Sequence, residues 1–347
     1  MKLIVNGSAV LRSSRGVRRY YNNISQYLSW PAGMSMSAVH NSGAINRLKE
    51  LLYRGSRDAI LWSPAQRGPL RALHHVVTVH DCINVEYTYR DDWRLPILRQ
   101  ATQQLLSNAE HIVAISHATE AALLRNYRIR PESLVVIPTS SDVQIASDLG
   151  GAPGIDGGGP PFILLVTNSL PHKNALRTCQ ALARSRARAE QVALRVVGSL
   201  PSEALDACLA GGISVEIDSA ISDATLRDWY RGCRFLLAPS LSEGHDLPVA
   251  EALTLGVNVL CSDIAAHREF FDGLVTYFDP FDTEAISSAI DQALDRGGRW
   301  SPGPLPTRSF ADVAGDYLEL FSAVNDNSGR TGLTISATPN STSKTPL

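Results

Sequence analysis

Short, continuous apolar runs alternate with amphipathic segments along most of the chain, and this alternation constrains the fold more than any other feature. Unbroken apolar runs are typical of strands buried on both faces, as in parallel sheets covered by helices. The pattern occurs twice, on either side of a break at 150–161 that is dense in glycine and proline. We therefore predict an α/β protein with two doubly wound, Rossmann-like domains that face each other across a cleft.

The predicted strands are 2–7, 59–63, 75–81, 111–116, 134–138, 162–168, 194–199, 213–217, 234–240, 258–262 and 274–278. The predicted helices are 16–28, 118–127, 174–185, 223–233, 247–256, 282–294 and 310–324.

The same pattern predicts the domain boundaries. We expect a first domain over 1–150, a linker or exposed loop over 151–161, and a second domain over 162–325 that includes the last helix. The remaining segment, 326–347, is rich in serine, threonine, asparagine and glycine, so we expect it to be disordered.

Composition excludes several classes of protein. The chain has 347 residues, 44% of them hydrophobic, and a net charge of −2, which argues against a general nucleic-acid binder. Its five cysteines are scattered without C-x-x-C spacing, which favours a reducing compartment over a disulfide framework or zinc site. No apolar run approaches the roughly 18–20 residues that span a bilayer, and the N-terminus resembles a strand more than a signal peptide. We expect a cytoplasmic protein.

Charge is divided unevenly between the two halves. Residues 1–150 carry a net charge of +6 and residues 151–347 a net charge of −8. The two domains could simply attract each other, or the first half could face an anionic partner such as a phosphorylated acceptor or a membrane. In the second case the first helix and its approach supply the contacts, through Arg12, Arg15, Arg18 and Arg19. Pairing of Arg19 with a carboxylate of its own domain is the alternative.

The most informative stretch is 234–263, where a buried strand is followed by a turn and a helix. Glu243 lies in the turn, His245 and Asp246 follow it, and a helix begins near Leu247 with proline next, where its missing N–H costs nothing. A helix N-terminus after a parallel strand attracts anions through its free N–H groups and its dipole. Glu251 stands eight positions after Glu243. The two carboxylates could accept hydrogen bonds from sugar and ribose hydroxyls beside a bound diphosphate.

Four further residues occupy comparable places. Lys173 and Asn174 lie between the first strand and first helix of the second domain, where lysine suits a phosphate. Gly16 starts the first helix, where a bare backbone lets a phosphate approach. His80 follows a buried strand and faces the cleft if the sheet is parallel. Each of these signals is weak when taken alone.

Taken together, these motifs resemble the GT-B glycosyltransferases of glycosyltransferase family 4, which are retaining enzymes with nucleotide-sugar donors. The pattern S-x-x-E-G-x-x-L-P-x-x-E-A matches 240–252, and P-[RH]-K-N matches 171–174. GVRRYYNNI, VVTVHD, IVAISHATEAAL and LVVIPTSSD resemble the first helix, a T-x-H-D strand end, a serine strand and a hinge strand of the family. The resemblance runs in order from about residue 3 to residue 300.

The resemblance implies a role for each candidate residue. Glu251 would bind ribose hydroxyls, and Glu243 a hydroxyl of the transferred hexose. Lys173 with Asn174, and the backbone around His245, Asp246 and Leu247, would hold the diphosphate, which Gly16 approaches from the other domain. His80 would contact the hexose near the reacting carbon. The implied catalytic residues are therefore His80, Glu243 and Lys173.

The resemblance also implies the reaction and its partners. A hexose, with mannose from GDP-mannose as the working hypothesis, would pass to a glycan or lipid-linked acceptor in bacterial surface polysaccharide synthesis. No cofactor is expected, and no Asp-x-Asp metal signature is evident. Lysine and helix dipoles would replace a metal ion.

Two departures from the family pattern bear on the donor pocket. His245-Asp246 stands where many members have Phe-Gly, and Thr167 stands where several have an arginine. These departures leave a non-catalytic nucleotide-sugar-binding protein as one alternative. A nucleotide-sugar 2-epimerase on the same fold is the other, although the HD and PHKN motifs argue against it. A dehydrogenase is disfavoured because no G-x-G-x-x-G follows a strand.

Overall fold

The computed structural model describes residues 1–30, 34–37, 44–87, 93–141, 161–296 and 308–326. The predicted linker lies outside these residues except for Pro161. The predicted disordered tail lies outside them except for Asp326, which ends the last helix. Among the described residues, no helix is long and apolar enough to cross a bilayer.

The first domain is built on a six-stranded sheet in the order β2-β1-β3-β4-β5-β6, with every neighbouring pair parallel. Its strands are β1 (Lys2–Asn6), β2 (Met34–Ser37), β3 (Ala59–Ser63), β4 (His75–Val79), β5 (His111–Ala114) and β6 (Leu134–Val136). Its helices are α1 (Gly7–Leu11), α2 (Arg15–Ser25), α3 (Ala44–Leu52), α4 (Ile83–Glu86), α5 (Leu95–Asn108) and α6 (His117–Asn126).

The second domain repeats this plan in the order β12-β11-β10-β7-β8-β9, again parallel. Its strands are β7 (Phe162–Thr167), β8 (Ala193–Gly198), β9 (Val215–Asp218), β10 (Leu236–Ala238), β11 (Val259–Ser262) and β12 (Thr276–Phe278). Its helices are α7 (Ala175–Arg184), α8 (Ser202–Ala210), α9 (Asp223–Gly232), α10 (Leu247–Thr254), α11 (Ala265–Phe271) and α12 (Thr283–Asp295).

Every predicted strand and helix is confirmed, with ends shifted by a few residues. The structure adds one strand, β2, whose sequence MSMS lacks the apolar run that identified the others. It also adds helices α1, α3, α4, α5, α8 and α11. Several of these are short, and α5 is exposed over much of its first half.

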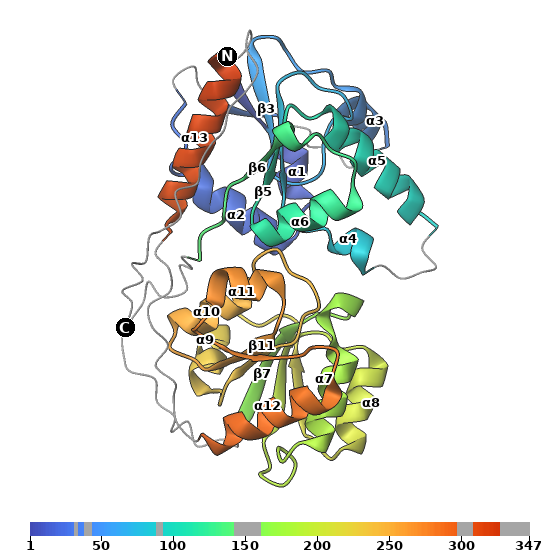
Figure 1. Ribbon diagram of the computed structural model, residues 1–347, viewed down its shortest axis with the longest axis vertical. Helices are drawn as coiled ribbons and strands as arrows, with labels where there is room; N and C mark the ends of the chain where they lie inside the picture. Colours follow the sequence, from blue (N-terminus) through green and yellow to red (C-terminus); the bar gives the residue numbers. More distant parts are fainter. Residues whose placement is uncertain (31–33, 38–43, 88–92, 142–160, 297–307, 327–347) are drawn as a thin grey trace, which may run out of the picture.

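In each parallel sheet the strand order reverses at one point, and these two switch points determine where a ligand can bind. In the first sheet the chain leaves β1 toward β2 and then returns to β3 on the other side of β1. In the second sheet the chain runs from β7 to β8 and β9, and then returns to β10 on the other side of β7. Ligands of open α/β sheets bind outside the carboxyl ends of the strands at such a switch point. The two domains meet along loops that follow these strands, with α2 above α10 (Figure 1).

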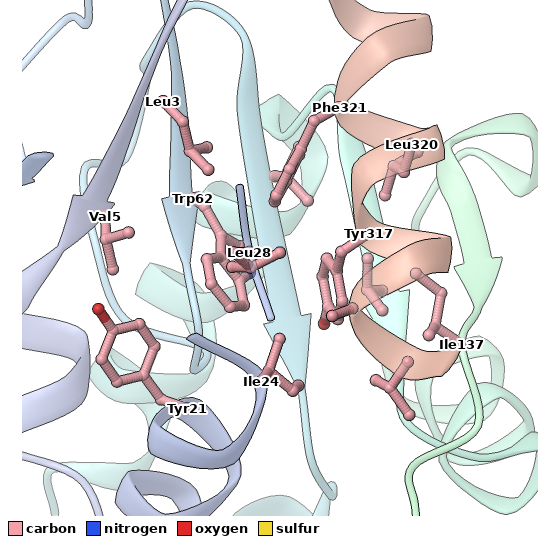
Figure 2. Close-up of a cluster of buried hydrophobic side chains, with 14 of the residues drawn as sticks. Leu3, Val5, Tyr21, Ile24, Leu28, Trp62, Ile137, Tyr317, Leu320 and Phe321 are labelled. Carbon is pink, nitrogen blue, oxygen red and sulfur yellow. The ribbon is translucent and has the colours of Figure 1, made fainter. Parts of the chain in front are cut away.

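The last helix, α13 (Phe310–Asp326), corrects one prediction. The sequence assigns it to the second domain, but it lies against α2 on the first domain (Figure 1). Figure 2 shows Tyr317 and Phe321 of α13 directed toward Trp62 of β3. The Tyr317 hydroxyl also hydrogen-bonds the Thr78 hydroxyl at 2.6 Å. The sequence of an amphipathic helix shows that one face is buried but not which sheet it packs on. Position along the chain therefore did not predict the domain of α13.

Phe321→Ala should destabilise the protein by about 3–5 kcal/mol, because it opens a cavity between α13 and Trp62 in a fully buried cluster. Phe281→Ala is the matched control, since Phe281 is 62% exposed. Urea unfolding measures both. Equal losses would contradict this account of α13 as part of the first core.

Candidate active site between the two domains

Lys173 and Glu243 meet at the switch point of the second sheet. Lys173 ends a short turn of 3-10 helix after β7, and Glu243 lies in the loop after β10. The lysine Nζ lies 2.5 Å from Glu243 Oε1, and both side chains are largely buried. Burial alone lowers the pKa of Lys173, but Glu243, Asp246 and Asp81 outweigh it and raise that pKa above its ordinary value. The lysine is therefore a fixed cation.

Glu251 lies on α10, buried at the boundary between the domains. Its Oε1 accepts a hydrogen bond from Arg19 Nη1 at 2.6 Å, and Arg19 belongs to α2 of the other domain. Its Oε2 accepts one from the Tyr230 hydroxyl at 3.0 Å. Burial raises the pKa of Glu251, and both of these partners oppose that rise. Hydrogen bonds from Arg19 and Tyr230 thus fix both oxygens of the Glu251 carboxylate.

Gly244 allows the two domains to approach closely, whereas Gly16 makes an ordinary contact across the same boundary. A Cβ on Gly244 would lie 1.8 Å from the carbonyl oxygen of His80, which no side chain could tolerate. A Cβ on Gly16 would lie 3.6 Å from Leu247 Cδ1, at the start of α10. The loop holding Glu243 therefore packs directly on the strand end holding His80.

His80 is a neutral acceptor in this geometry. Its Nε2 lies 2.8 Å from the carbonyl oxygen of Pro64. A carbonyl only accepts, so Nε2 carries the proton and Nδ1 keeps its lone pair. Burial lowers the pKa of His80 to about 4, and an edge-to-face contact with Tyr20 fixes the ring. The next residue, Asp81, has its pKa raised to about 6 by burial and by nearby Glu243.

Asp246 occupies a backbone conformation that favours glycine, with φ of +81°. Its buried carboxylate lies 3.0 Å from His267 Nε2, while His267 Nδ1 lies 2.8 Å from the carbonyl oxygen of Ser262. Both acceptors require an N–H, so His267 carries both protons. Burial alone lowers the pKa of His267, but Asp246 raises it well above the ordinary value. This buried ion pair stabilises the strained turn before α10.

His245 packs against the second domain's aromatic side chains. Its ring lies 4.4 Å from that of Phe270, centroid to centroid, and its Nε2 lies 2.9 Å from the Ser141 hydroxyl. Burial lowers its pKa to about 4, so it is neutral. Its Nδ1 is buried and has no hydrogen-bond partner among the described residues.

The remaining candidate, Asn174, has its side chain engaged elsewhere. It adopts a left-handed conformation with φ of +54°, and its amide donates to the carbonyl oxygen of Pro280 at 2.8 Å. Asn174 is the N-cap residue of α7, but its side chain does not cap that helix. A direct contact between Asn174 and a donor stays a prediction.

The structure gathers Gly16, His80, Lys173, Glu243 and the start of α10 around one region. Sequence reasoning missed three partners there: Arg19 as a neighbour of Glu251, Tyr230, and His267. The sequence suggested either an anionic partner or a carboxylate of its own domain for Arg19, but the residue pairs with a carboxylate of the other domain. Tyr230 and His267 lie on helices with no motif, so nothing in the sequence identifies them.

The described residues bring no three His, Cys, Asp or Glu side chains together in a group that could hold a metal ion. The arrangement offers one buried lysine, a helix N-terminus and two held carboxylates at the meeting of two Rossmann-like domains. Such a set can bind a phosphate-bearing ligand with several hydroxyl groups.

Family models match both halves of the chain. Residues 9–144 match the model described as Glycosyltransferase Family 4, and residues 160–296 the model described as Glycosyl transferases group 1. The chain belongs to this family of GT-B glycosyltransferases.

Two curated relatives of this glycosyltransferase are mannosyltransferases. An MMP alpha-(1->4)-mannosyltransferase of Mycolicibacterium hassiacum is 27% identical over 240 residues, 63% of this chain and 56% of that protein. O-antigen chain mannosyltransferase B of Escherichia coli is 36% identical over 74 residues, 21% of this chain and 19% of that protein. The chain thus spans about half the length of the first relative.

Solved structures share the fold of this glycosyltransferase. A glycosyltransferase from Rickettsia africae has a TM-score of 0.61 at 13% identity, covering 94% of this chain and 98% of that one. WaaG, a glycosyltransferase involved in lipopolysaccharide biosynthesis, has a TM-score of 0.60 at 16% identity over the same shares. Anabaena HepE in complex with UDP and glucose has a TM-score of 0.60 at 14% identity, covering 94% and 97%. The likeness shows the GT-B fold.

His267→Gln should change how stability depends on pH. Because its pKa is raised on folding, the protonation of His267 stabilises the fold fully below about pH 6.5, and this stabilisation is lost as pH rises through the folded value. The gap in unfolding free energy between wild type and variant should therefore be largest near pH 6 and smaller at pH 9. Urea unfolding at both pH values measures it.

The matched control is His117→Gln, which replaces an exposed histidine. A gap for His267→Gln that stays constant from pH 6 to pH 9 would show that His267 is not charged in the native state.

Proposed function

We propose that this glycosyltransferase transfers a hexose from a nucleoside-diphosphate sugar to a glycan or lipid-linked acceptor, with retention of configuration. The observation that carries the proposal is the meeting of Lys173, Glu243 and Glu251 at the carboxyl ends of β7 and β10, opposite His80 of the other domain. This is where an open α/β sheet binds its ligand.

Each side chain suits one part of the donor. Glu251 accepts hydrogen bonds from the ribose hydroxyls, and Glu243 from a hydroxyl of the hexose. Lys173 and the free N–H groups at the start of α10 hold the diphosphate. His80 presents Nδ1 as an acceptor toward the hexose, because its Nε2 proton is committed to Pro64.

The chemistry then follows from charge. The bond between the anomeric carbon and the diphosphate oxygen breaks, and the acceptor oxygen bonds to that carbon on the same face. The acceptor's proton passes to the leaving diphosphate. Negative charge grows on that leaving group in the transition state, and Lys173 and the α10 dipole stabilise it without reorganising. We propose that no metal cofactor is needed.

Mannose from GDP-mannose is the donor we favour. Both curated relatives are mannosyltransferases, and one is named for an O-antigen chain, which supports surface polysaccharide synthesis as the pathway. The other is named for an alpha linkage, which is the outcome of retention from an α-configured donor. We place the reaction in the cytoplasm.

Glu251→Ala and Lys173→Ala should each weaken donor binding roughly ten- to a hundredfold, since each removes a charged hydrogen bond worth about 1.5–3 kcal/mol. Thermal shift across a panel of nucleotide sugars identifies the donor by mass action, and calorimetry then measures each variant. Glu216→Ala, an exposed glutamate of the same domain, should bind like wild type.

Binding as tight as wild type in both variants would show that the site is misplaced.

In the transfer assay, activity should persist in EDTA, and loss restored by magnesium or manganese would contradict the metal-free proposal. Incubating the donor alone separates transfer from epimerisation, because only an epimerase converts it without an acceptor.

We further propose that the first domain contacts an anionic membrane surface carrying the acceptor. Three of the four arginines suggested by the sequence are poor candidates, because Arg12 pairs with Glu50, Arg15 with Asp223 and Arg19 with Glu251. The start of α5 is better: Trp93, Ile97 and Leu98 are 76%, 61% and 56% exposed. Arg94 and Arg99 lie among these residues and suit anionic headgroups, while Asp91 and Asp92 precede them in the sequence.

Changing both Trp93 and Ile97 to Ser should weaken binding to anionic vesicles at least fivefold, because two exposed apolar side chains no longer enter the interface. Vesicle co-sedimentation measures this. Leu209→Ser, at a side chain 56% exposed on the second domain, is the control. Equal binding by all three proteins would favour a water-soluble acceptor.

A further inference from the structure

Among the described ion pairs, Arg19 is the residue of the first domain that pairs with Glu251. It lies on the second turn of α2, and its guanidinium reaches across the domain boundary to Glu251 Oε1 at 2.6 Å. The Arg19 side chain is 31% exposed and that of Glu251 is 8% exposed. The pair is therefore sheltered from solvent on the carboxylate side.

The second domain alone leaves Glu251 with incomplete support. Tyr230 donates to Oε2, but a hydroxyl is neutral and does not compensate a buried negative charge. Burial raises the pKa of Glu251, and the charge of Arg19 is the largest opposing influence. An unpaired buried carboxylate would take up a proton or swing toward water, and either change would weaken it as an acceptor.

The Glu251 carboxylate has hydrogen-bond acceptor positions that its two protein partners do not use. Each carboxylate oxygen can accept two hydrogen bonds, and each oxygen of Glu251 has one described here, from Arg19 and from Tyr230. A pair of vicinal hydroxyls could use the remaining positions while both protein contacts persist. Arg19 and the ribose are thus compatible neighbours of Glu251.

We propose that Arg19 is a positioning residue for ribose recognition: the first domain supplies the counter-charge that holds Glu251 in place to receive the donor's ribose. This inference rests on the proposed function and deepens it. It makes the nucleotide site complete only when the two domains are together, although the nucleotide itself lies on the second domain.

A second inter-domain ion pair provides an internal comparison. Arg15, four residues before Arg19, pairs with Asp223 at 2.5 Å, but both side chains are more than 70% exposed. Exposed pairs contribute little to stability. Loss of Arg15 removes an inter-domain contact without changing the surroundings of Glu251, so Arg15→Ala controls for a general loosening of the two domains.

The test measures binding of GDP and of 2′,3′-dideoxy-GDP to wild type, Arg19→Ala, Arg19→Lys and Arg15→Ala by calorimetry. Wild type should bind GDP at least tenfold more tightly than the dideoxy probe. Arg19→Ala should lose at least tenfold in affinity for GDP and less than twofold for the dideoxy probe, because its effect passes through the ribose hydroxyls. Arg19→Lys should keep part of the preference, and Arg15→Ala all of it.

Three outcomes overturn the proposal. Equal losses for both probes in Arg19→Ala would show that Arg19 contacts the diphosphate or the base. Unchanged affinity of Arg19→Ala for GDP would show that Tyr230 alone positions Glu251. Failure of wild type to bind GDP, or to prefer it over the dideoxy probe, would instead overturn the proposed donor site, and this inference with it. Near-ultraviolet circular dichroism confirms that each variant is folded.

Discussion

A buried carboxylate needs a positive partner, and in this protein Glu251 finds that partner in the other domain. The contact with Arg19 joins α10 to α2 at the centre of the boundary. Beside it, Gly244 lets the loop of Glu243 rest on the strand end of His80. Both the ion pair and the close backbone packing cross the domain boundary, so both would be lost if the domains separated.

Topology explains why the other charged groups meet at the same place. The reversal of the second sheet between β7 and β10 brings Lys173 and Glu243 together from segments 70 residues apart in the chain. Their mutual attraction offsets the cost of burying both charges. The Asp246–His267 pair does the same for the turn before α10, where aspartate occupies a position at which many family members have glycine. The Glu251–Arg19, Lys173–Glu243 and Asp246–His267 pairs thus each place two opposite charges together near the site.

Much of this could be predicted from sequence, and the reasons are specific. Strands buried on both faces are unbroken apolar runs, so nearly every strand was evident, whereas β2, with the sequence MSMS, was not. Lys173, Glu243 and Glu251 belong to motifs whose spacing is local. Arg19 with Glu251, and α13 on the first core, are contacts between distant segments. Amphipathicity and charge show that such groups need partners, but only the packed chain determines which partners they have.

The central claim is that the nucleotide binds on Glu251 while Arg19 still holds that carboxylate. A crystal structure of the protein with a nucleoside diphosphate tests it most directly. The account predicts ribose hydroxyls within hydrogen-bond distance of Glu251, the diphosphate on Lys173 and the start of α10, and Arg19 still paired with Glu251. A nucleotide bound away from Glu251, or Arg19 displaced from it, would contradict the account.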